Sequence, residues 1–598
     1  MNNLRKILEE KLWVLPLIKK MSENYSITIT SMEGVFESLG YRKWIHPIEK
    51  NTSEAKLEYA LKQVIRLSRK WHMYGDLHEL LQINGVNVGE LAQQMMMDLF
   101  FPFFMDVDNA ELFLKNEKPD IVYIQNDLFT LESALHTVAL AHGIQASFFE
   151  PRIYRHLKKK LHSYFAYKLY KSFNFPRFSG LYLLNGVQCN ESNCRILMDL
   201  PYINDFNAVF PVIQELINRG ICECYILGDR SVLSKRFRNI EPVKIRNKTV
   251  YKRKMNPKEL SKYYHSKLKR DSCFQAIFTY RGMNFWDAVK ESIHLLFDRK
   301  FIDIIHNINY FDTVIQTIKP NLLVVADDRA IRVRGHVLLA KHRGIPVLDI
   351  QHGVYLPTRP FDTPIADKLA AGGNYTKRVY IKYGAREDQV VVTGWPKFDI
   401  YKKLKDNSFK RKRKEKLNIL FATSPLDFKL NLDIIETISL FIKDSLNLRL
   451  MVKPHPIENT KMYDVVSKKH KTVTLCESKE DITKLLALSD LLIFFSSDTV
   501  GLEALLLDKP IICINMTNKE AIYVSSGVAV EVKNLQDIIP AIMDTLYSEE
   551  SLTRLAEKRK RFVYEHTYLH DGQASKRVTD LILQMIKRNN EEVVLFRN

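Results

Sequence analysis

Two short apolar runs constrain the fold of this chain more than any other feature. Leu322 to Ala326 and Val347 to Ile350 are nearly unbroken, and each stops abruptly at polar residues. The stretch between them has the length of a helix and ends at Gly344. Strands that are apolar on both faces are typical of parallel sheets covered by helices on both sides. The chain is therefore predicted to contain an α/β domain with a parallel sheet.

The same alternation recurs along the chain and predicts several domains. It begins near residue 193, pauses at the basic stretch 402–416, and continues to about residue 575. A length of 598 residues is too great for one hydrophobic core. We expect an extra N-terminal α/β region at 1–180, Rossmann-like domains at 190–400 and 415–575, and a C-terminal helix or tail at 576–598.

The N-terminal region contains a weak internal repeat. Residues 118–151 resemble residues 319–352 at a constant offset of 201, and Pro151 stands at the place of His352. The first segment is either a decayed duplicate, which would make 1–180 a degenerate Rossmann-like unit, or a second case of the general strand–helix–strand pattern. Both alternatives stay open.

Two further N-terminal segments suggest a surface role. Residues 93–107 carry a dense apolar cluster, and residues 152–178 interleave Lys and Arg with Tyr and Phe. Basic and aromatic side chains together suit the headgroup region of an anionic membrane. A helix packed by its aromatic side chains on a neighbouring domain explains the second pattern equally well.

The net charge of the chain indicates which classes of binding partner to expect. There are 89 Lys and Arg against 69 Asp and Glu, a formal charge of +20 that favours polyanions. No nucleic-acid-binding signature accompanies this charge, so nucleic acid is not an expected partner.

The seven cysteines show no zinc-type pairing and are expected to be reduced. No apolar run approaches the roughly 20 residues that span a bilayer. We expect a cytoplasmic protein that can lie peripherally on the inner face of the cell membrane.

Polar residues gather at the carboxyl ends of the predicted strands, where ligands of open parallel sheets bind. They are Asp327 and Asp328, His352 and Gly353, Thr423 and Ser424, Lys453 and His455, and Ser496, Ser497 and Thr499. Any one of these groups alone is as typical of an ordinary loop. Small hydroxyls and backbone N–H groups at helix starts can bind phosphate oxygens. Glu503, about two helical turns after Ser496, can accept hydrogen bonds from ribose hydroxyls.

The order of five motifs resembles that of bacterial transferases with the GT-B fold. The motifs are "QHG" at 351–353, "TGWPKFD" at 393–399, "KPHP" at 453–456, "SSDTVGLEALLLDKP" at 496–510 and "DGQAS" at 571–575. They are most similar to those of CDP-glycerol glycerophosphotransferases, capsular and surface-polysaccharide glycosyltransferases, and sialyltransferases with a His-Pro motif. The resemblance covers about residues 190–580 and implies two Rossmann-like domains that face a cleft.

This resemblance implies a division of roles between the two domains. Residues 190–400 would bind the acceptor, and residues 415–575 the nucleotide donor. His352 is the expected catalytic base, because an imidazole with a pKa near 6.5 takes up a proton at neutral pH. His455 is the second expected catalytic residue and would lie near phosphate. Asp327, Asp328 and Gly353 would lie on the acceptor side. The expected donor-binding residues are Ser424, Lys453, Ser496, Ser497, Thr499 and Glu503.

The implied partners are small molecules and glycans. The donor would be a CMP-, CDP- or UDP-linked sugar, the acceptor a glycan or lipid-linked glycan, and no separate cofactor is expected. No metal site is assigned either. Asp106 and Asp108 have the Asp-x-Asp spacing of another glycosyltransferase fold, but they are expected to cap a helix that begins near Asn109.

The leading hypothesis is a glycosyltransferase that transfers a sugar from a nucleotide-activated donor to a surface polysaccharide or lipid-linked glycan. Transfer of glycerol or ribitol phosphate from a CDP-polyol, as in teichoic-acid synthesis, would use the same cleft and stays open. A sugar-nucleotide 2-epimerase is less favoured, because "QHGVY" stands where those enzymes carry an acidic motif. A non-catalytic scaffold that binds glycan or membrane is an alternative of a different class, and the two histidines together with Glu503 argue against it.

Overall fold

The computed structural model divides the chain into two compact units. Unit 1 comprises Met1–Ile83, Asn87–Asn174 and Tyr251–His306, and unit 2 comprises Asn84–Val86, Phe175–Val250 and Asn307–Asn598. The structure describes residues 53–124, 130–148, 180–184, 194–237, 240–244, 257–353, 364–406, 416–425, 427–443, 447–495, 499–516 and 521–595. The basic-aromatic segment 152–178 and Pro151, singled out above, lie outside these residues.

Unit 1 is mainly helical. Its elements are α4 (Glu54–Lys70), η2 (Trp71–Met73), α5 (Leu77–Leu80), β1 (Gln82–Ile83), β2 (Val86–Asn87), α6 (Val88–Leu91), α7 (Gln93–Glu117), β3 (Ile121–Ile124), α8 (Thr130–Ala141), β4 (Gln145–Phe148), α12 (Pro257–Tyr263), η3 (Tyr264–Leu268), α13 (Ser272–Ala276), β9 (Thr279–Tyr280), β10 (Met283–Asn284), α14 (Trp286–Leu295) and η4 (Leu296–Lys300). Aromatic side chains hold it together: the rings of Trp71 and Phe301 stack at 6.1 Å, and those of Phe104 and Tyr280 at 4.0 Å. This packing is why residues 257–306 lie in unit 1, although their place in the sequence put them in the 190–400 domain.

The predicted helix start near Asn109 is wrong. Helix α7 runs without interruption from Gln93 to Glu117, so Asp108 lies well inside it. The Asp108 carboxylate is buried, accepts a hydrogen bond from the Tyr280 hydroxyl at 3.1 Å, and pairs with Arg281 at 2.7 Å. Asp108 therefore holds α7 to the β9–β10 hairpin.

Unit 2 contains two sheets. The strands of the first are β5 (Gly180–Leu184), β6 (Arg195–Leu200), β7 (Glu223–Gly228), β8 (Ile240–Pro242), β11 (Leu322–Val325), β12 (Val347–Ile350), β13 (Lys368–Ala371) and β14 (Val390–Val392). The helices that accompany it are α10 (Ile203–Arg219), α11 (Arg230–Leu233), α15 (Phe301–Ile318), which begins in unit 1, α16 (Ile331–His342) and α17 (Asn374–Lys382). The strand order is β14-β13-β12-β11-β6-β7-β5-β8, and the strands from β14 to β7 are parallel.

The second sheet has six parallel strands in the order β17-β16-β15-β18-β19-β20. They are β15 (Leu417–Ala422), β16 (Leu448–Lys453), β17 (Val473–Leu475), β18 (Leu491–Phe495), β19 (Ile511–Ile514) and β20 (Val530–Val532). The remaining elements are η5 (Pro396–Phe398), α18 (Asp399–Asp406), α19 (Phe428–Ile442), η6 (Thr460–Tyr463), α20 (Asp464–Lys469), α21 (Ile482–Leu488), α22 (Val500–Leu506), α23 (Ile522–Ser525), η7 (Leu535–Asp537), α24 (Ile538–Tyr547), α25 (Glu549–Thr567) and α26 (Ala574–Leu595).

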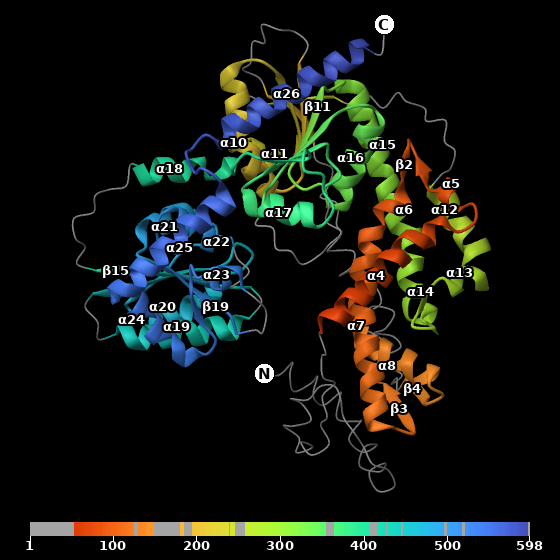
Figure 1. Cartoon of the computed structure of the whole chain (residues 1–598), viewed down its shortest axis with the longest axis horizontal. Coiled ribbons are helices and arrows are strands. Elements are labelled where there is room, and N and C mark those ends of the chain that lie inside the picture. Colours follow the sequence, from red (N-terminus) through yellow and green to blue (C-terminus); the bar gives the residue numbers. More distant parts are fainter. Residues whose placement is uncertain are drawn as a thin grey trace. The chain divides into compact units, whose positions relative to one another are not determined.

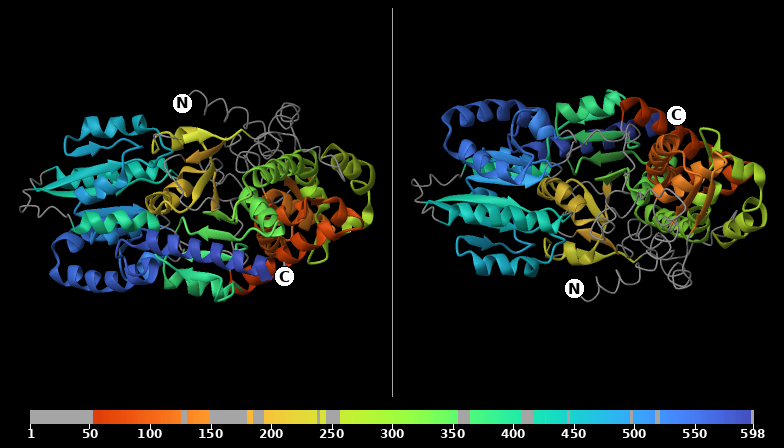
Figure 2. Two further views of the ribbon diagram at one scale, coloured as in Figure 1. Left: turned by 90° about the horizontal axis from the view of Figure 1, so that it is seen from above. Right: turned by 90° about the horizontal axis from the view of Figure 1, so that it is seen from below.

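Helices cover both faces of the second sheet (Figure 2). Ile419 and Phe421 point to one face and pack with α19 and α24, whereas Leu420 and Ala422 point to the other and pack with α21 and α22. Alternate strand residues thus enter two different cores, which explains the unbroken apolar runs in the sequence. The predicted α/β class with two Rossmann-like parallel sheets is confirmed.

Two segments join the cores of the two sheets. Trp395, Phe398 and Tyr401 follow the first sheet in sequence but pack into the core of the second. Helix α26 follows the second sheet and packs Ile582 and its neighbours against the first (Figure 1). The chain therefore crosses between the sheets twice, near residue 395 and near residue 574.

The offset of 201 is visible in the elements themselves. Strand β3 and strand β11 begin 201 positions apart, and α8 and α16 begin and end 201 positions apart. Lys118 and Lys319 precede these units with left-handed φ values of 47° and 51°, and Gly143 and Gly344 end the two helices with φ values of 73° and 71°. Both copies are thus strand–helix–strand units with parallel strands.

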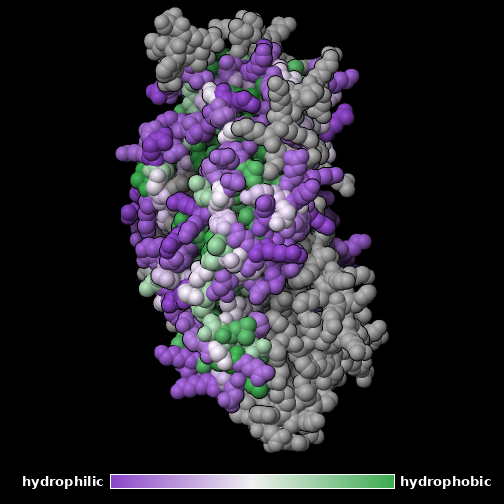
Figure 3. All heavy atoms as spheres, turned by 90° about the vertical axis from the view of Figure 1, so that its right-hand side faces the viewer, coloured by the Kyte–Doolittle hydropathy of each residue, from purple (hydrophilic) through white to green (hydrophobic). Residues whose placement is uncertain are grey.

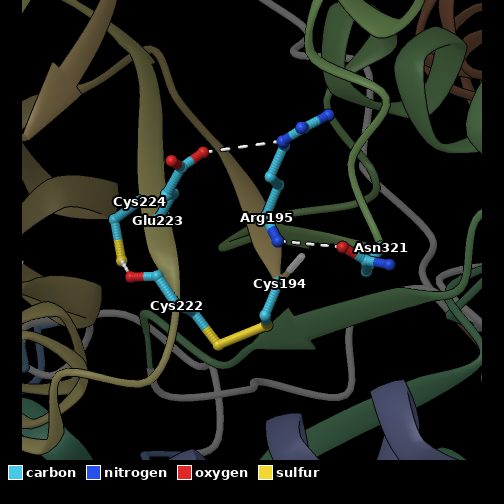
Figure 4. The surroundings of a disulfide bond; sticks show 6 residues. All are labelled: Cys194, Arg195, Cys222, Glu223, Cys224 and Asn321. Carbon is cyan, nitrogen blue, oxygen red and sulfur yellow. Dashed lines mark hydrogen bonds and ion pairs between the residues drawn. A yellow bond between two sulfur atoms is a disulfide. The ribbon is translucent and has the colours of Figure 1, made fainter. Parts of the chain in front are cut away.

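A disulfide joins Cys194 and Cys222, whose Cα atoms are 4.8 Å apart (Figure 4). These residues directly precede β6 and β7, and the register pairs Arg195 with Glu223. Parallel pairing therefore brings two cysteines that are 28 residues apart in sequence side by side. The expectation that all seven cysteines are reduced does not hold for this pair.

Within the described part of the chain, no helix is both long and apolar enough to cross a membrane. On the face drawn in Figure 3, hydrophilic side chains predominate among the coloured residues, and hydrophobic ones lie scattered between them. Scattered apolar residues of this kind are normal for a protein surface.

Candidate functional site

His352 lies two residues after the end of strand β12, at the carboxyl end of the first sheet. Its Nδ1 atom donates a hydrogen bond to the backbone carbonyl of Ala326, at 2.5 Å. A proton on Nδ1 leaves the Nε2 atom of the neutral ring as a hydrogen-bond acceptor. Burial lowers the pKa of His352, and the charge of Asp327 opposes this shift. The imidazole is therefore neutral at pH 7 and held in the tautomer that accepts a proton at Nε2.

The side chain of Gln351 fixes the loop that carries His352. Its Oε1 atom accepts a hydrogen bond from the backbone N–H of Gly372 at 2.7 Å, and its Nε2 atom donates to the carbonyl of Gly353 at 2.9 Å. The "QHG" motif thus contains one residue that anchors the loop and one that presents an imidazole.

The two predicted acceptor-side aspartates have different surroundings. Asp327 is a quarter exposed and pairs with Arg329 at 2.8 Å. Asp328 is buried, and its Oδ2 atom accepts hydrogen bonds from the backbone N–H groups of Ile365 and Ala366 at 2.6 and 2.9 Å. Asp328 therefore holds the backbone in place, while Asp327 is partly exposed and paired with Arg329.

The same edge of the sheet carries a further titratable group that sequence analysis missed. Asp205, near the start of α10, is buried. Burial and the charge of Asp327 raise the pKa of Asp205 to about 7. This edge of the first sheet thus has two groups, His352 and Asp205, that change protonation near or below neutral pH.

His455 lies at the carboxyl end of β16, in the second sheet, and has the opposite tautomer. The Glu458 carboxylate accepts hydrogen bonds from the backbone N–H of His455 at 2.8 Å, from the Tyr463 hydroxyl at 2.7 Å and from the Thr423 hydroxyl. The Nδ1 atom of His455 accepts a hydrogen bond from the backbone N–H of Ile457 at 3.4 Å. A neutral ring that accepts at Nδ1 carries its proton on Nε2. Burial lowers the pKa of His455, so this ring too is neutral at pH 7 and offers a donor.

Two of the predicted donor-binding residues, Lys453 and Ser424, lie in or next to loops that side-chain-to-backbone hydrogen bonds hold in place. The Nζ atom of Lys453 donates to the carbonyl oxygens of Pro454 and Ser478, at 2.9 and 2.7 Å. The backbone carbonyl of Ser424 accepts a hydrogen bond from the Asn431 side chain at 2.7 Å. Lys453 is buried, and burial lowers its pKa. Lys453 and the Asn431 side chain therefore stabilise the loops after β16 and β15.

Glu503 lies in the first turn of α22, and Thr499 stands at the N-cap of this helix. The Oε2 atom of Glu503 accepts a hydrogen bond from the Tyr401 hydroxyl at 2.6 Å. Burial raises the pKa of Glu503, and the ammonium group of Lys397 opposes this. The Nζ atom of Lys397 also donates to the backbone carbonyl of His352, at 3.2 Å. Ser496 and Ser497 lie outside the described residues.

Lys397 is thus linked to two predicted site residues, to His352 by a hydrogen bond and to Glu503 by the attraction of opposite charges. His352 and His455 are not joined by a hydrogen bond in the described part of the chain. Lys397, Tyr401 and Glu458 were assigned no role from the sequence. The first two belong to or follow the "TGWPKFD" motif, which was a signal for them, whereas Glu458 had no signal beyond its place three residues after His455.

The match to a protein family concerns mainly the second sheet. Residues 365–584 match the family model of CDP-Glycerol:Poly(glycerophosphate) glycerophosphotransferase. The match begins before β13, covers His455 and Glu503, and ends within α26. No curated protein matches the chain.

Several solved structures are similar at low identity. The UDP complex of MnaA from S. aureus is 18% identical with a TM-score of 0.44, covering 65% of this chain and 96% of that one. UDP-GlcNAc 2-epimerase from Neisseria meningitidis bound to UDP-GlcNAc is 16% identical with a TM-score of 0.43, covering 65% and 100%. A glycosyltransferase from Rickettsia africae is 14% identical with a TM-score of 0.39, covering 66% and 99%. These likenesses are too weak to support a statement about substrate.

The family match confirms the resemblance predicted from the five motifs. It covers the part of the chain that contains four of them, and the two parallel sheets provide the expected architecture. The motifs, the fold and the family match agree on an enzyme of the GT-B type that resembles the CDP-glycerol glycerophosphotransferases and uses a nucleotide-linked donor.

Proposed function

We propose that the chain transfers a group from a nucleotide-activated donor to an acceptor hydroxyl, with His352 as the base and His455 as a phosphate ligand. The observation that carries this proposal is the pair of opposite hydrogen-bond arrangements at the two Nδ1 atoms, from which we assign opposite tautomers. His352 is held with a free acceptor atom at Nε2, and His455 with a donor at Nε2. One histidine can take a proton, and the other can give a hydrogen bond to an anion.

The reaction requires a proton acceptor for the attacking hydroxyl and a hydrogen-bond donor for the leaving phosphate, and the two tautomers provide one each. The acceptor hydroxyl must lose a proton as it attacks, and the leaving phosphate gains negative charge. The Nε2 atom of His352 takes the proton, with Asp327 beside it to stabilise the imidazolium that forms. The Nε2–H group of His455 donates to a phosphate oxygen of the donor. Glu503 accepts hydrogen bonds from the ribose hydroxyls.

The leading form of the reaction is sugar transfer. The acceptor oxygen forms a bond to the anomeric carbon, the bond from that carbon to the phosphate oxygen breaks, and the nucleotide leaves with the phosphate. The proposed acceptor is a surface polysaccharide or lipid-linked glycan, as in capsule synthesis. No metal ion is required in this scheme.

The second candidate is transfer of a polyol phosphate, which the family match at residues 365–584 favours. Here the acceptor oxygen attacks the phosphorus atom next to the polyol, and cytidine monophosphate leaves. The same base and the same phosphate ligand serve this reaction. The two candidates differ in the product, which is a glycosidic bond in one case and a phosphodiester in the other.

The test is a donor screen on the purified full-length chain. Wild type, His352→Ala and His455→Ala are incubated with CMP-, CDP- and UDP-linked sugars and with CDP-glycerol, and released nucleotide and ³¹P spectra are recorded. We expect at least about a 100-fold loss of transfer in His352→Ala, since a general base supplies 10²–10⁴-fold. A smaller loss with weaker donor binding is expected in His455→Ala. Wild-type transfer in both variants would refute the mechanism.

A further inference from the structure

We propose that Lys397 is a positioning residue that couples the nucleotide-side carboxylate of Glu503 to the loop that carries His352. This inference rests on the proposed function for the roles of Glu503 and His352. Lys397 itself belongs to η5, in the segment where the chain crosses from the first sheet to the second.

The ammonium group of Lys397 has fixed partners on several sides. Its Nζ atom donates to the backbone carbonyl of His352 at 3.2 Å. It also lies 4.9 Å from the ring centroid of Trp395 and 4.8 Å from that of Phe398. These distances are within the range of cation–π attraction. Glu503 supplies the opposing negative charge, which counters the lowering of the Lys397 pKa by burial. The same ammonium group therefore holds the loop that carries His352 by a hydrogen bond and attracts the Glu503 carboxylate on α22.

The backbone around Lys397 is held in place. The Nε1 atom of Trp395 donates to the carbonyl of His566 at 2.8 Å. Gly372 lies against the Trp395 ring so closely that a Cβ atom there would be 1.3 Å from the indole nitrogen. The Asp399 carboxylate accepts hydrogen bonds from the backbone N–H groups of Ala574 and Ser575. The backbone on both sides of Lys397 is thus held by hydrogen bonds and close packing.

The same segment orients Glu503. Tyr401 is 3% exposed and packs in the core of the second sheet. Its hydroxyl donates to the Oε2 atom of Glu503 at 2.6 Å and lies 3.2 Å from the Thr483 hydroxyl. Tyr401 therefore occupies one carboxylate oxygen of Glu503 and fixes its direction, and the Oε1 atom stays available to a ribose hydroxyl. The charge of Lys397 opposes the rise in the Glu503 pKa that burial causes and so favours the ionised carboxylate.

The charge of Lys397 also acts on His352. The charged groups that act on the His352 imidazole are Asp327, which raises its pKa, and Arg329 and Lys397, which lower it. Removal of the Lys397 charge would therefore raise the pKa of His352. A residue that only filled space in η5 would have no such effect, so the titration of His352 distinguishes a coupling role from a structural one.

The experiment compares four proteins as full chains: wild type, Lys397→Met, Lys397→Gln and the control Lys405→Met. Lys397→Gln keeps a hydrogen-bond donor for the His352 carbonyl but loses the charge. Lys405 pairs with Asp508 on the surface at 2.6 Å. Histidine-labelled protein is titrated by NMR, with the His352 signal assigned by its loss in His352→Gln. Calorimetry with UDP and CDP gives the nucleotide dissociation constants.

The proposal expects the His352 titration to move to higher pH in both Lys397 variants. It also expects the nucleotide dissociation constant to rise about 5- to 10-fold, which corresponds to about 1–1.4 kcal/mol, because Glu503 loses the charge that opposes its protonation. The control should match wild type in both measurements. An unchanged His352 titration in both folded variants, or an equal change in Lys405→Met, would overturn the coupling. A wild type that binds neither nucleotide would refute the proposed function instead, and the titration would still decide the link between Lys397 and His352.

Discussion

At the scale of single residues, the most informative property is the protonation state of His352. Its Nδ1 atom is tied to the Ala326 carbonyl, and burial lowers the pKa of the ring. A base is active in its deprotonated form, so activity should fall only when the pH drops below the pKa of the free enzyme's base. We predict that the acid limb of the kcat/KM profile lies below pH 6.5 in wild type. Initial rates between pH 5 and pH 8.5 measure it.

Asp205 supplies the control for this profile, because its pKa is raised to about 7. Asp205 is neutral below that pH and charged above it, so it could produce a limb near neutrality by itself. Asp205→Asn should leave the acid limb where it is in wild type. If the limb disappears in Asp205→Asn, the titrating group is Asp205 and the role given to His352 is wrong.

The sequence could predict where the histidines lie but not what holds them. An apolar run followed by a polar loop predicts a strand end, and both His352 and His455 stand at such ends. Their tautomers depend on the Ala326 carbonyl and the Ile457 amide, which are atoms of the backbone and carry no sequence signal. Glu503 and Lys397 are 106 positions apart (503 minus 397), so their relation depends on the crossing of the chain between the sheets.

At the scale of elements, Asp399 explains why two of the five motifs occur together. Asp399 closes "TGWPKFD", and its carboxylate accepts hydrogen bonds from Ala574 N at 3.0 Å, Ser575 N at 2.8 Å and the Ser575 hydroxyl at 2.6 Å. Ala574 and Ser575 close "DGQAS" and begin α26. A carboxylate at a helix start satisfies free N–H groups and opposes the helix dipole. The first motif thus caps the helix that the second one begins.

We predict that Asp399→Ala loosens the first turn of α26 and lowers the free energy of unfolding by about 1–2 kcal/mol, the usual cost of losing a helix cap. Hydrogen exchange at the amides of Ala574 and Ser575 should become faster, and the midpoint of thermal unfolding should fall. Glu557→Ala, an exposed change on α25, is the control and should alter neither measurement. Unchanged exchange at both amides in Asp399→Ala would contradict the capping role.

The sequence predicted the positions of strands and helices better than it predicted which strands and which cysteines pair. The offset of 201 predicted two similar strand–helix–strand units, and β3 and α8 correspond to β11 and α16. Whether they share an origin stays open. The disulfide was missed because Cys194 and Cys222 become neighbours only through the register of β6 and β7. Register is decided by the partner strand, and a single strand's sequence does not contain it.

At the scale of the whole molecule, the sequence predicted two Rossmann-like sheets but not the composition of unit 1. Residues 257–306 lack the strand pattern of the flanking segments, and their aromatic side chains pack with α4, η2 and α7 instead. The formal charge of +20 is also a property of the whole chain. It is the basis of the expectation, made from the sequence, that the chain can lie on an anionic membrane surface.

This expectation predicts salt-dependent binding to anionic vesicles. Full-length protein should sediment with vesicles that contain 30% phosphatidylserine but not with neutral ones, and binding should weaken as salt is added because salt screens the attraction. Replacement of Lys158, Lys159 and Lys160 by Gln should weaken binding at least about tenfold, since each basic residue near the surface contributes about 1 kcal/mol. The matched control replaces Lys410, Lys412 and Lys414, which removes the same charge from the basic linker. An equal loss in both triple variants would assign binding to net charge alone, and sedimentation with neutral vesicles would exclude an electrostatic origin.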